Sequence, residues 1–520
     1  MRIFKYVVIQ KYSYILIFFF ALLLILLTSP FEIPLWQDRA YLLYMSQVIY
    51  RGENIYEVTT FGYTPLAQLI AGSIMRIVEL FTVTVDTILI SRILGILLYA
   101  ACCSAFLALA RNIFKNIQVS FIISIFFTGI SFLQYISATN LEPKILAMFF
   151  EIMAIIGIMK SRYLFAGVFF ALAAMCWQPM VINCFAVTGF ILLNQQIISC
   201  KAIQFIKLLS GVLIGTLPIV FYIILTGQLQ DFWFQAVMRK IGQEGSELFD
   251  DPLRWLFISI YPTYINEAFI FVLSSMGFLI ISYKSTINML KGKWASIKDP
   301  VKLFFILTVF WSLFNTLEFQ GPLDLLPMIP ILLIWAGYFI SYLTARFPSI
   351  NSKWMLIPAI LYALLNTFSY QYSGTYSEQK EFINQIAPDD QKILPFSFEE
   401  YAVIKEIPLP SRLMRFEKYE DFIIDRIYER GCLDVIDQLR ENKDLVAILA
   451  RYNPENGQSK FGECGEAIIK EFTDSSGNKN YEILTGRSHI LLNKFKRRAY
   501  RYYVIKNREM FLNNPDKFQY

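Results

Sequence analysis

Histidine is nearly absent from this 520-residue sequence, which has only His489, near the C-terminal end. The apolar N-terminal part therefore has no histidine for general acid–base catalysis. The same absence argues against a zinc site rich in histidine.

Cysteine is sparse, and the seven cysteines are scattered without Cys-x-x-Cys spacing. Five lie in or beside apolar segments and are predicted to be buried thiols: Cys102, Cys103, Cys176, Cys184 and Cys200. Cys432 and Cys464 are the other two. They could form a disulfide if their region lies outside the cytoplasm, and stay reduced otherwise.

Charged residues are also few, at 17% of the chain, whereas 56% of the residues are hydrophobic. Soluble domains contain about 25% charged and about 45–50% apolar residues, so this composition indicates a membrane protein. Charged residues crowd the chain after about residue 368. We therefore predict two domains, a transmembrane domain over 1–368 and a soluble domain over 369–520. No basic module interleaved with aromatics stands out, so nucleic acid is not an expected partner.

Apolar runs long enough to span a bilayer predict about eleven transmembrane helices. The runs centre on Phe20, Leu98, Ile125, Met153, Leu172, Val187, Leu213, Leu273, Val309, Leu333 and Ala363. The first follows a basic N-terminus and lacks a small-residue cleavage pattern, so we interpret it as an uncleaved signal-anchor rather than a signal peptide.

Basic residues recur in alternate loops between these runs, for example Arg111 with Lys115 and Lys160 with Arg162. The intervening loops are nearly free of them, Lys144 being the exception. This pattern predicts a multi-pass plasma membrane protein with a cytoplasmic N-terminus and a C-terminal domain outside.

Two outer loops are long, about 30–85 and about 227–266, and both are rich in Trp and Tyr. In the first, apolar residues recur at helical spacing between Ala40 and Arg51, and again over Pro65–Glu79. We expect interfacial helices there, lying on the outer membrane surface. In the C-terminal region, strand patterns over 393–396, 445–449 and 481–484 and a helical pattern over 422–440 predict a small α/β domain.

Short motifs on the predicted outer side follow a recognisable order. The first loop has Leu35-Trp36-Gln37-Asp38-Arg39, then Gly52 to Tyr56, then Tyr63-Thr64-Pro65-Leu66. Ser137 to Pro143 lies at the outer end between the third and fourth predicted helices. This order resembles the GT-C superfamily of membrane glycosyltransferases, most closely the branch of protein O-mannosyltransferases and lipid A aminoarabinose transferases. The resemblance spans nearly the whole chain, although each motif is short.

The resemblance implies two catalytic carboxylates, Asp38 and Glu142. Both also have ordinary explanations. Asp38 could cap a helix, and Glu142 with Pro143 suits the first turn of a helix.

Binding roles are predicted more broadly. Candidates for the donor phosphate are Arg39, Arg51, Tyr63, Arg92, Arg239, Lys240 and Arg254. Candidates for acceptor or loop contacts are Tyr56, Asn140 and Asp324. Two positions depart from the family pattern: Tyr63 stands where the aminoarabinose transferases have a lysine, and Asp324 stands where an aromatic or basic residue is usual.

The chemistry required of such an enzyme agrees with these residues. A sugar on a lipid phosphate must be attacked where the headgroup meets water, by an acceptor hydroxyl that a carboxylate deprotonates or orients. Positive charge must stabilise the leaving phosphate. We therefore predict an inverting glycosyltransferase that uses a polyprenyl-phosphate sugar donor and a lipid, glycan or protein acceptor. The alternative is a transporter or flippase, which would place charges in mid-span and show internal repeats.

No cofactor is required by this prediction, and no metal site is predicted. The sequence has no Asp-x-Asp motif. A divalent ion held by carboxylates stays an open alternative.

Overall fold

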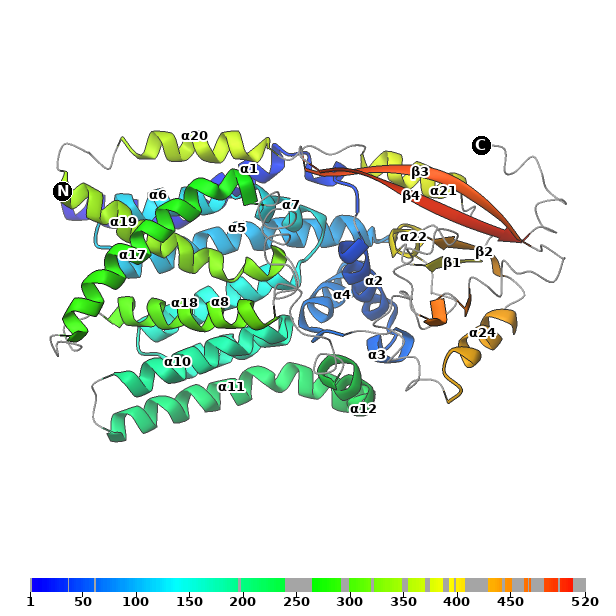
Figure 1. Ribbon diagram of the computed structural model, residues 1–520, viewed down its shortest axis with the longest axis horizontal. Coiled ribbons are helices and arrows are strands. Elements are labelled where there is room, and N and C mark those ends of the chain that lie inside the picture. Colours follow the sequence, from blue (N-terminus) through cyan, green and yellow to red (C-terminus); the bar gives the residue numbers. More distant parts are fainter. Residues whose placement is uncertain are drawn as a thin grey trace.

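The computed structural model describes residues 2–35, 37–59, 62–194, 198–238, 264–290, 299–318, 322–347, 354–369, 375–386, 392–396, 399–406, 429–441, 445–450, 463–465, 467–468, 481–493 and 496–507. Helices form a bundle with the N-terminus at one end, and a β-sheet lies beyond the other end (Figure 1).

Each of the eleven predicted apolar centres lies in a helix, as the length and hydropathy of the runs require. These helices are α1 (Arg2–Leu26), α5 (Thr87–Ile113), α6 (Ile117–Thr128), α8 (Pro143–Met159), α9 (Tyr163–Cys176), α10 (Ile182–Leu193), α11 (Ile198–Thr226), α17 (Ala268–Leu290), α18 (Asp299–Glu318), α19 (Met328–Arg346) and α20 (Leu356–Thr367).

Not all of these helices are long enough to cross a membrane alone. Within the described ranges, four helices have the length and composition of a span: α5, α11, α17 up to Ile287, and α19. A fifth results if α6 and α7 (Ser131–Thr139), which bend by 54° at a short break, count together. The multi-pass membrane character is thus supported, and the count of eleven crossings stays a prediction.

The break between α6 and α7 has polar partners for the carbonyls that it frees. Thr128 O accepts from Tyr99 Oη at 2.5 Å and from Gln134 Nε2 at 2.7 Å, and Gly129 O accepts from Asn366 Nδ2 at 2.7 Å. Freed backbone groups inside a bundle are tolerated only when neighbouring side chains satisfy them. The break turns the chain so that α7 ends at the start of α8.

The segment between α1 and α5, predicted to be the first outer loop, contains a short 3-10 turn, η1 (Pro30–Glu32), and three helices. These are α2 (Gln37–Arg51), α3 (Ile55–Val58) and α4 (Leu66–Glu79). Helices occur at both places where the apolar spacing predicts them. In Figure 1 they lie at the end of the bundle nearest the sheet.

One expectation for α2 is wrong, because the helix does not lie on an open surface. Its residues from Arg39 to Ile49 are buried. The helix packs against α4 on one side and against α22 (Glu399–Lys405) of the C-terminal region on another. Gln47 of α2 also links α5 and α22, since its Nε2 donates to Thr87 Oγ1 at 2.9 Å and to Val403 O at 3.1 Å.

The remaining described elements before the C-terminal region are short and lie in the connections between the bundle helices. They are η2 (Gln178–Val181), α12 (Leu229–Phe232), η3 (Trp233–Met238), η5 (Ile265–Glu267) and η7 (Pro322–Leu325).

The C-terminal region contains a four-stranded sheet with strand order β1-β2-β4-β3. The strands are β1 (Lys392–Phe396), β2 (Leu445–Ala450), β3 (Tyr481–Asn493) and β4 (Lys496–Asn507), with helices α21 (Tyr376–Ile386) and α24 (Cys432–Glu441). The first two strands are parallel and the other pairs antiparallel. A strand occurs at each of the three predicted places, and a disulfide joins Cys432 to Cys464.

The C-terminal region is fastened to the first outer loop. Gln379 of α21 accepts from Leu35 N at 2.8 Å and donates to Leu35 O at 3.0 Å. Ser377 Oγ donates to the Glu32 carboxylate at 2.9 Å. The predicted boundary at 368/369 stays a prediction, but these contacts tie the two parts together at the outer loop.

Candidate functional site

The site begins at the first turn of α2. Because this helix starts at Gln37, Asp38 lies within its first turn rather than at the capping position. A carboxylate is favoured there by the positive end of the helix dipole. Asp38 is partly exposed, whereas the next residue, Arg39, is only 1% exposed.

The second part of the site is the connection from α7 to α8. Ser91 Oγ of α5 accepts from Leu141 N at 3.2 Å, which holds this connection against α5. Glu142 is the N-cap residue of α8 and Pro143 its first residue, but the Glu142 side chain makes no capping hydrogen bond. The ordinary first-turn explanation therefore accounts for Pro143 and leaves the Glu142 carboxylate for another contact.

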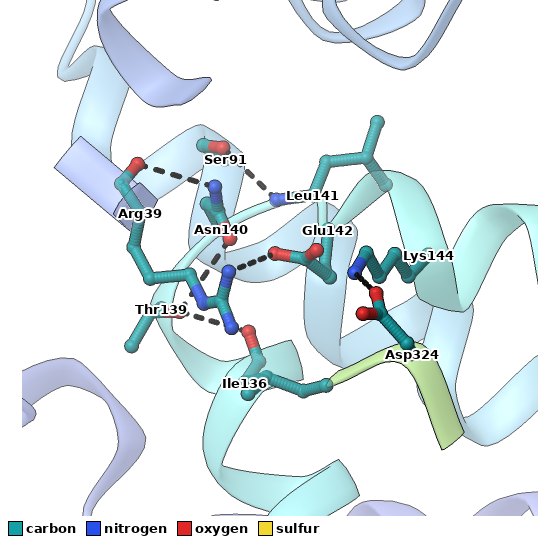
Figure 2. Close-up of polar contacts among 9 residues, drawn as sticks. All are labelled: Arg39, Ser91, Ile136, Thr139, Asn140, Leu141, Glu142, Lys144 and Asp324. Carbon is teal, nitrogen blue, oxygen red and sulfur yellow. Dashed lines mark hydrogen bonds and ion pairs between the residues drawn. The ribbon is translucent and has the colours of Figure 1, made fainter. Parts of the chain in front are cut away.

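That contact is an ion pair with Arg39, shown in Figure 2. Arg39 Nη1 lies 3.0 Å from Glu142 Oε2, and the side chains are 1% and 2% exposed. Asn140 Nδ2 donates to Arg39 O at 3.3 Å, which adds a second bond between α2 and the α7–α8 connection. Two predicted catalytic segments thus meet, since Asp38 directly precedes Arg39.

The Arg39 guanidinium has further hydrogen-bonding capacity. Among the described residues, its Nε and Nη2 atoms have no hydrogen-bond partner, although both are buried. A buried ion pair is held in place strongly, because losing either partner leaves an uncompensated buried charge.

A second ion pair lies at the same turn of α8. Lys144 Nζ is 2.7 Å from Asp324 Oδ1 in η7, and the side chains are 15% and 9% exposed. The ammonium also lies 4.5 Å from the centre of the Trp177 ring. Lys144 was not among the predicted site residues. Its one sequence signal was its place as the exception to the positive-inside pattern.

Tyr56 and Tyr63 act on the conformation of the first loop. Tyr56 Oη donates to Tyr63 O at 2.6 Å, and Gln235 Nε2 of η3 donates to Tyr56 O at 3.0 Å. Burial, followed by the nearby phenols of Tyr222 and Tyr41, raises the pKa of Tyr56 well above its usual range. Tyr56 is therefore a neutral hydrogen-bond donor that closes the turn ending at Tyr63, which is itself partly exposed.

The other predicted cations lie elsewhere. Arg92 donates to the carbonyls of Pro30, Phe31 and Ile33 and lies under the Tyr376 ring at 4.6 Å. Arg51 pairs with Glu53 at 3.0 Å. Through its contacts with the carbonyls of Pro30, Phe31 and Ile33, Arg92 holds η1 in place. Arg239, Lys240 and Arg254 lie outside the described residues.

A cleft of about 690 Å³ opens beside Arg92. It is lined by η1, the start of α5 and α21, and contains neither Asp38 nor Glu142. In the described part of the chain, no group of three or more His, Cys, Asp or Glu residues is arranged to hold a metal ion.

The structure contains two buried carboxylates that were not predicted from the sequence, Glu151 and Glu267. Glu151 of α8 accepts from Asn183 Nδ2 at 3.0 Å, and Asn183 in turn accepts from Trp311 Nε1 at 2.9 Å. Glu267 of η5 accepts from Ser131 N at 3.1 Å, Ser131 Oγ at 2.9 Å and Asn366 Nδ2 at 3.1 Å. A lone acid in or beside an apolar run is the signal that could have found them.

Comparisons with known proteins identify the architecture. A scan against models of protein families finds no match, and neither does a search of curated protein sequences. Among solved structures, the chain is similar to ArnT from Cupriavidus metallidurans in the apo state, with a TM-score of 0.54, 10% identity and coverage of 98% of this chain and 99% of that one. It is also similar to the oligosaccharyltransferase of Archaeoglobus fulgidus in complex with Zn and sulfate, with a TM-score of 0.52, 12% identity and coverage of 88% and 71%.

Both proteins belong to the GT-C superfamily. The chain has the GT-C fold. The resemblance predicted from Asp38, Gly52 to Tyr56 and Glu142 is thereby confirmed at the level of the fold. Sequence identities of 10% and 12% transfer no residue role from either GT-C protein.

Proposed function

We propose that the protein is a membrane glycosyltransferase that moves a sugar from a polyprenyl-phosphate donor to an acceptor hydroxyl at the outer face of the membrane. The observation that carries this proposal is the buried Arg39–Glu142 ion pair, which fixes the α2 turn bearing Asp38 against the start of α8. The GT-C fold supports a glycosyltransferase over the transporter or flippase.

Asp38 serves as the base in this proposal. The acceptor oxygen attacks the anomeric carbon of the sugar, and its proton passes to the Asp38 carboxylate. The bond from the anomeric carbon to the phosphate oxygen breaks, and its electron pair stays on the polyprenyl phosphate. A direct displacement of this kind inverts the anomeric configuration. Partial exposure suits Asp38 to meet an acceptor that arrives from water.

Glu142 is a positioning residue, because its carboxylate is already engaged with Arg39. Asn140 supports the same turn through the Arg39 carbonyl. The ion pair keeps both charges in place next to the reacting groups, where fixed charges act more strongly than in water.

The acceptor is a lipid A–like lipid, a surface glycan, a protein hydroxyl or a small lipid. We place the protein in the bacterial inner membrane, with the N-terminus in the cytoplasm and the C-terminal domain outside. No cofactor is required, and a divalent ion stays an open alternative.

The test is sugar transfer by the purified full chain in lipid nanodiscs, with a labelled polyprenyl-phosphate sugar and a panel of the four acceptor classes. Asp38→Asn should lower the transfer rate by at least about a hundredfold, the usual contribution of a general base. Glu57→Gln is the matched control, since Glu57 is an exposed acid in the same loop whose carboxylate accepts only from Asn54 among the contacts described. Full activity in a folded Asp38→Asn variant contradicts the proposed base.

A further inference from the structure

Lys144 is the one basic residue in a short outer loop that the positive-inside rule leaves unexplained. We propose that Lys144 binds the phosphate of the lipid-linked donor, and that Asp324 occupies its ammonium group until the donor arrives. This inference rests on the proposed function, and it assigns a residue to the phosphate of the donor.

Position is the first argument. Glu142 and Lys144 flank Pro143 at the start of α8, so the two ion pairs of the site meet at one helical turn (Figure 2). The positive end of the α8 dipole lies at this turn and favours an anion. The buried Arg39 guanidinium next to it has two nitrogens without a hydrogen-bond partner in the described part of the chain. Arg39 thus adds positive charge beside this turn, although it is itself enclosed with Glu142.

Availability is the second argument. Arg39 is enclosed with Glu142, and Arg92 is engaged by three backbone carbonyls. The Lys144 side chain is 15% exposed. Lys144 is therefore more accessible to an incoming phosphate than Arg39 or Arg92, which are each 1% exposed.

The partners of Lys144 suit an exchange of anions. Asp324 belongs to η7, a 3-10 turn of four residues, rather than to a long helix. Trp177 supports the ammonium through its ring face at 4.5 Å, a contact that stays favourable when the carboxylate leaves. Replacing a carboxylate by a phosphate keeps Lys144 paired and exchanges one charge-assisted hydrogen bond for another.

The exchange also favours the reaction. When the bond to the sugar breaks, the phosphate changes from a diester with one negative charge to a monoester with a second ionisable oxygen. A fixed ammonium stabilises this developing charge more in the transition state than in the bound donor.

The experiment measures binding of a polyprenyl phosphate to the full chain in nanodiscs, compared with the uncharged polyprenol of the same length. The ratio of the two affinities reports the phosphate alone. We expect Lys144→Gln to lower this ratio about tenfold or more, the effect of losing one hydrogen bond to a charged group. Lys144→Arg should retain part of the preference for polyprenyl phosphate. Asp324→Asn should raise it, because the competing anion is gone.

Lys302→Gln is the matched control. Lys302 also pairs with an aspartate, Asp299 at 3.3 Å, but within the first turn of α18 rather than between two elements. Lys302→Gln should leave the ratio of the two affinities unchanged. If Lys144 had only a structural role, Lys144→Gln would change the affinities for polyprenyl phosphate and polyprenol equally.

The outcomes separate the two proposals. A wild-type protein that binds polyprenyl phosphate no better than polyprenol contradicts the donor class of the proposed function. A wild type that prefers the phosphate, with an equal preference in Lys144→Gln, overturns only the role of Lys144. If Lys144→Gln does not fold, Asp324→Asn decides, and an unchanged or lower phosphate preference in that variant overturns the inference.

Discussion

Arg39 Nη1 and Glu142 Oε2 lie 3.0 Å apart, although the first residue belongs to the first outer loop and the second to the start of α8. The chain thus closes its outer loop on the bundle with a charged contact that excludes water almost entirely. This relationship can be tested without knowing the substrate.

The ion pair predicts a strong coupling between its two residues. Arg39→Met and Glu142→Gln should each lower the stability of the folded protein by about 3–5 kcal/mol, because each strands a buried polar or charged partner. The double variant should lose much less than the sum of the two. Thermal unfolding of all four proteins in one detergent measures the coupling, and additive losses would show that the pair is not formed.

Gly95 predicts a steric effect on the same site. A Cβ atom at this position in α5 would lie 2.1 Å from Ser137 O and 2.3 Å from Asn140 O. Gly95→Ala should therefore push the α7–α8 connection away from α5, lower stability by about 1–3 kcal/mol and reduce sugar transfer. Both are measured by thermal unfolding and by the transfer assay.

Gly189→Ala in α10 is the control for this effect. Its Cβ would meet only Ile306 and Phe310 side-chain atoms, both at 3.9 Å. That change should keep activity and raise stability by about 0.5–1 kcal/mol, as alanine does in a helix interior. If Gly95→Ala and Gly189→Ala have the same stability and the same transfer rate, Gly95 does not affect the site.

Glu267 predicts a pH dependence of stability. It lies in η5, directly before the span that begins at Ala268. Burial raises its pKa from 4.5 to about 7, against the opposing hydrogen bonds from Ser131 and Asn366. The folded state therefore holds the proton more tightly than the unfolded state. The resulting stability is present below pH 4.5 and is lost as the pH rises through about 7.

The loss should be on the order of 3 kcal/mol, and Glu267→Gln, which does not titrate, should lack it. Thermal unfolding at a series of pH values from 4 to 8, on the wild type and this variant, measures the difference. Parallel pH profiles would show that Glu267 does not titrate with folding.

The predicted orientation is tested by position-specific labels. A reporter fused after Lys517 should be detected outside the cytoplasm. Cys432 and Cys464 should react with a thiol reagent only after reduction, because the two form a disulfide. A cytoplasmic reporter signal would reverse the predicted sidedness.

The sequence predicts the helices well, because a run of apolar residues needs no partner to be recognised. It predicts Arg39 and Glu142 as candidates, but not their ion pair, since pairing depends on how the loop folds over the bundle. The sequence does not reveal the break at Gly129, because it lies inside an apolar run. Its contacts come from distant residues: α20 packs closely on Gly129, and the Asn366 amide donates to the Gly129 carbonyl. The sequence marks Lys144 as an exception but does not explain it, because only the tertiary structure brings its partner Asp324 to it.

The sheet is also only partly predicted from the sequence. Strand β4 was not predicted, because its sequence from Lys496 to Asn507 carries many basic residues and lacks a clear apolar alternation. Its pairing with β2 and β3 places it in the sheet.

The hydrogen bonds from Gln47 to Thr87 and Val403 join elements that are synthesised at different times. The first outer loop is made early, whereas α22, which covers α2, is made after the whole bundle. Until residues 399–405 are made, the face of α2 that packs against α22 lacks its cover. We therefore expect the loop that carries Asp38 to complete its packing only after α22 is made, and a chain that ends before α22 to leave this face of α2 exposed.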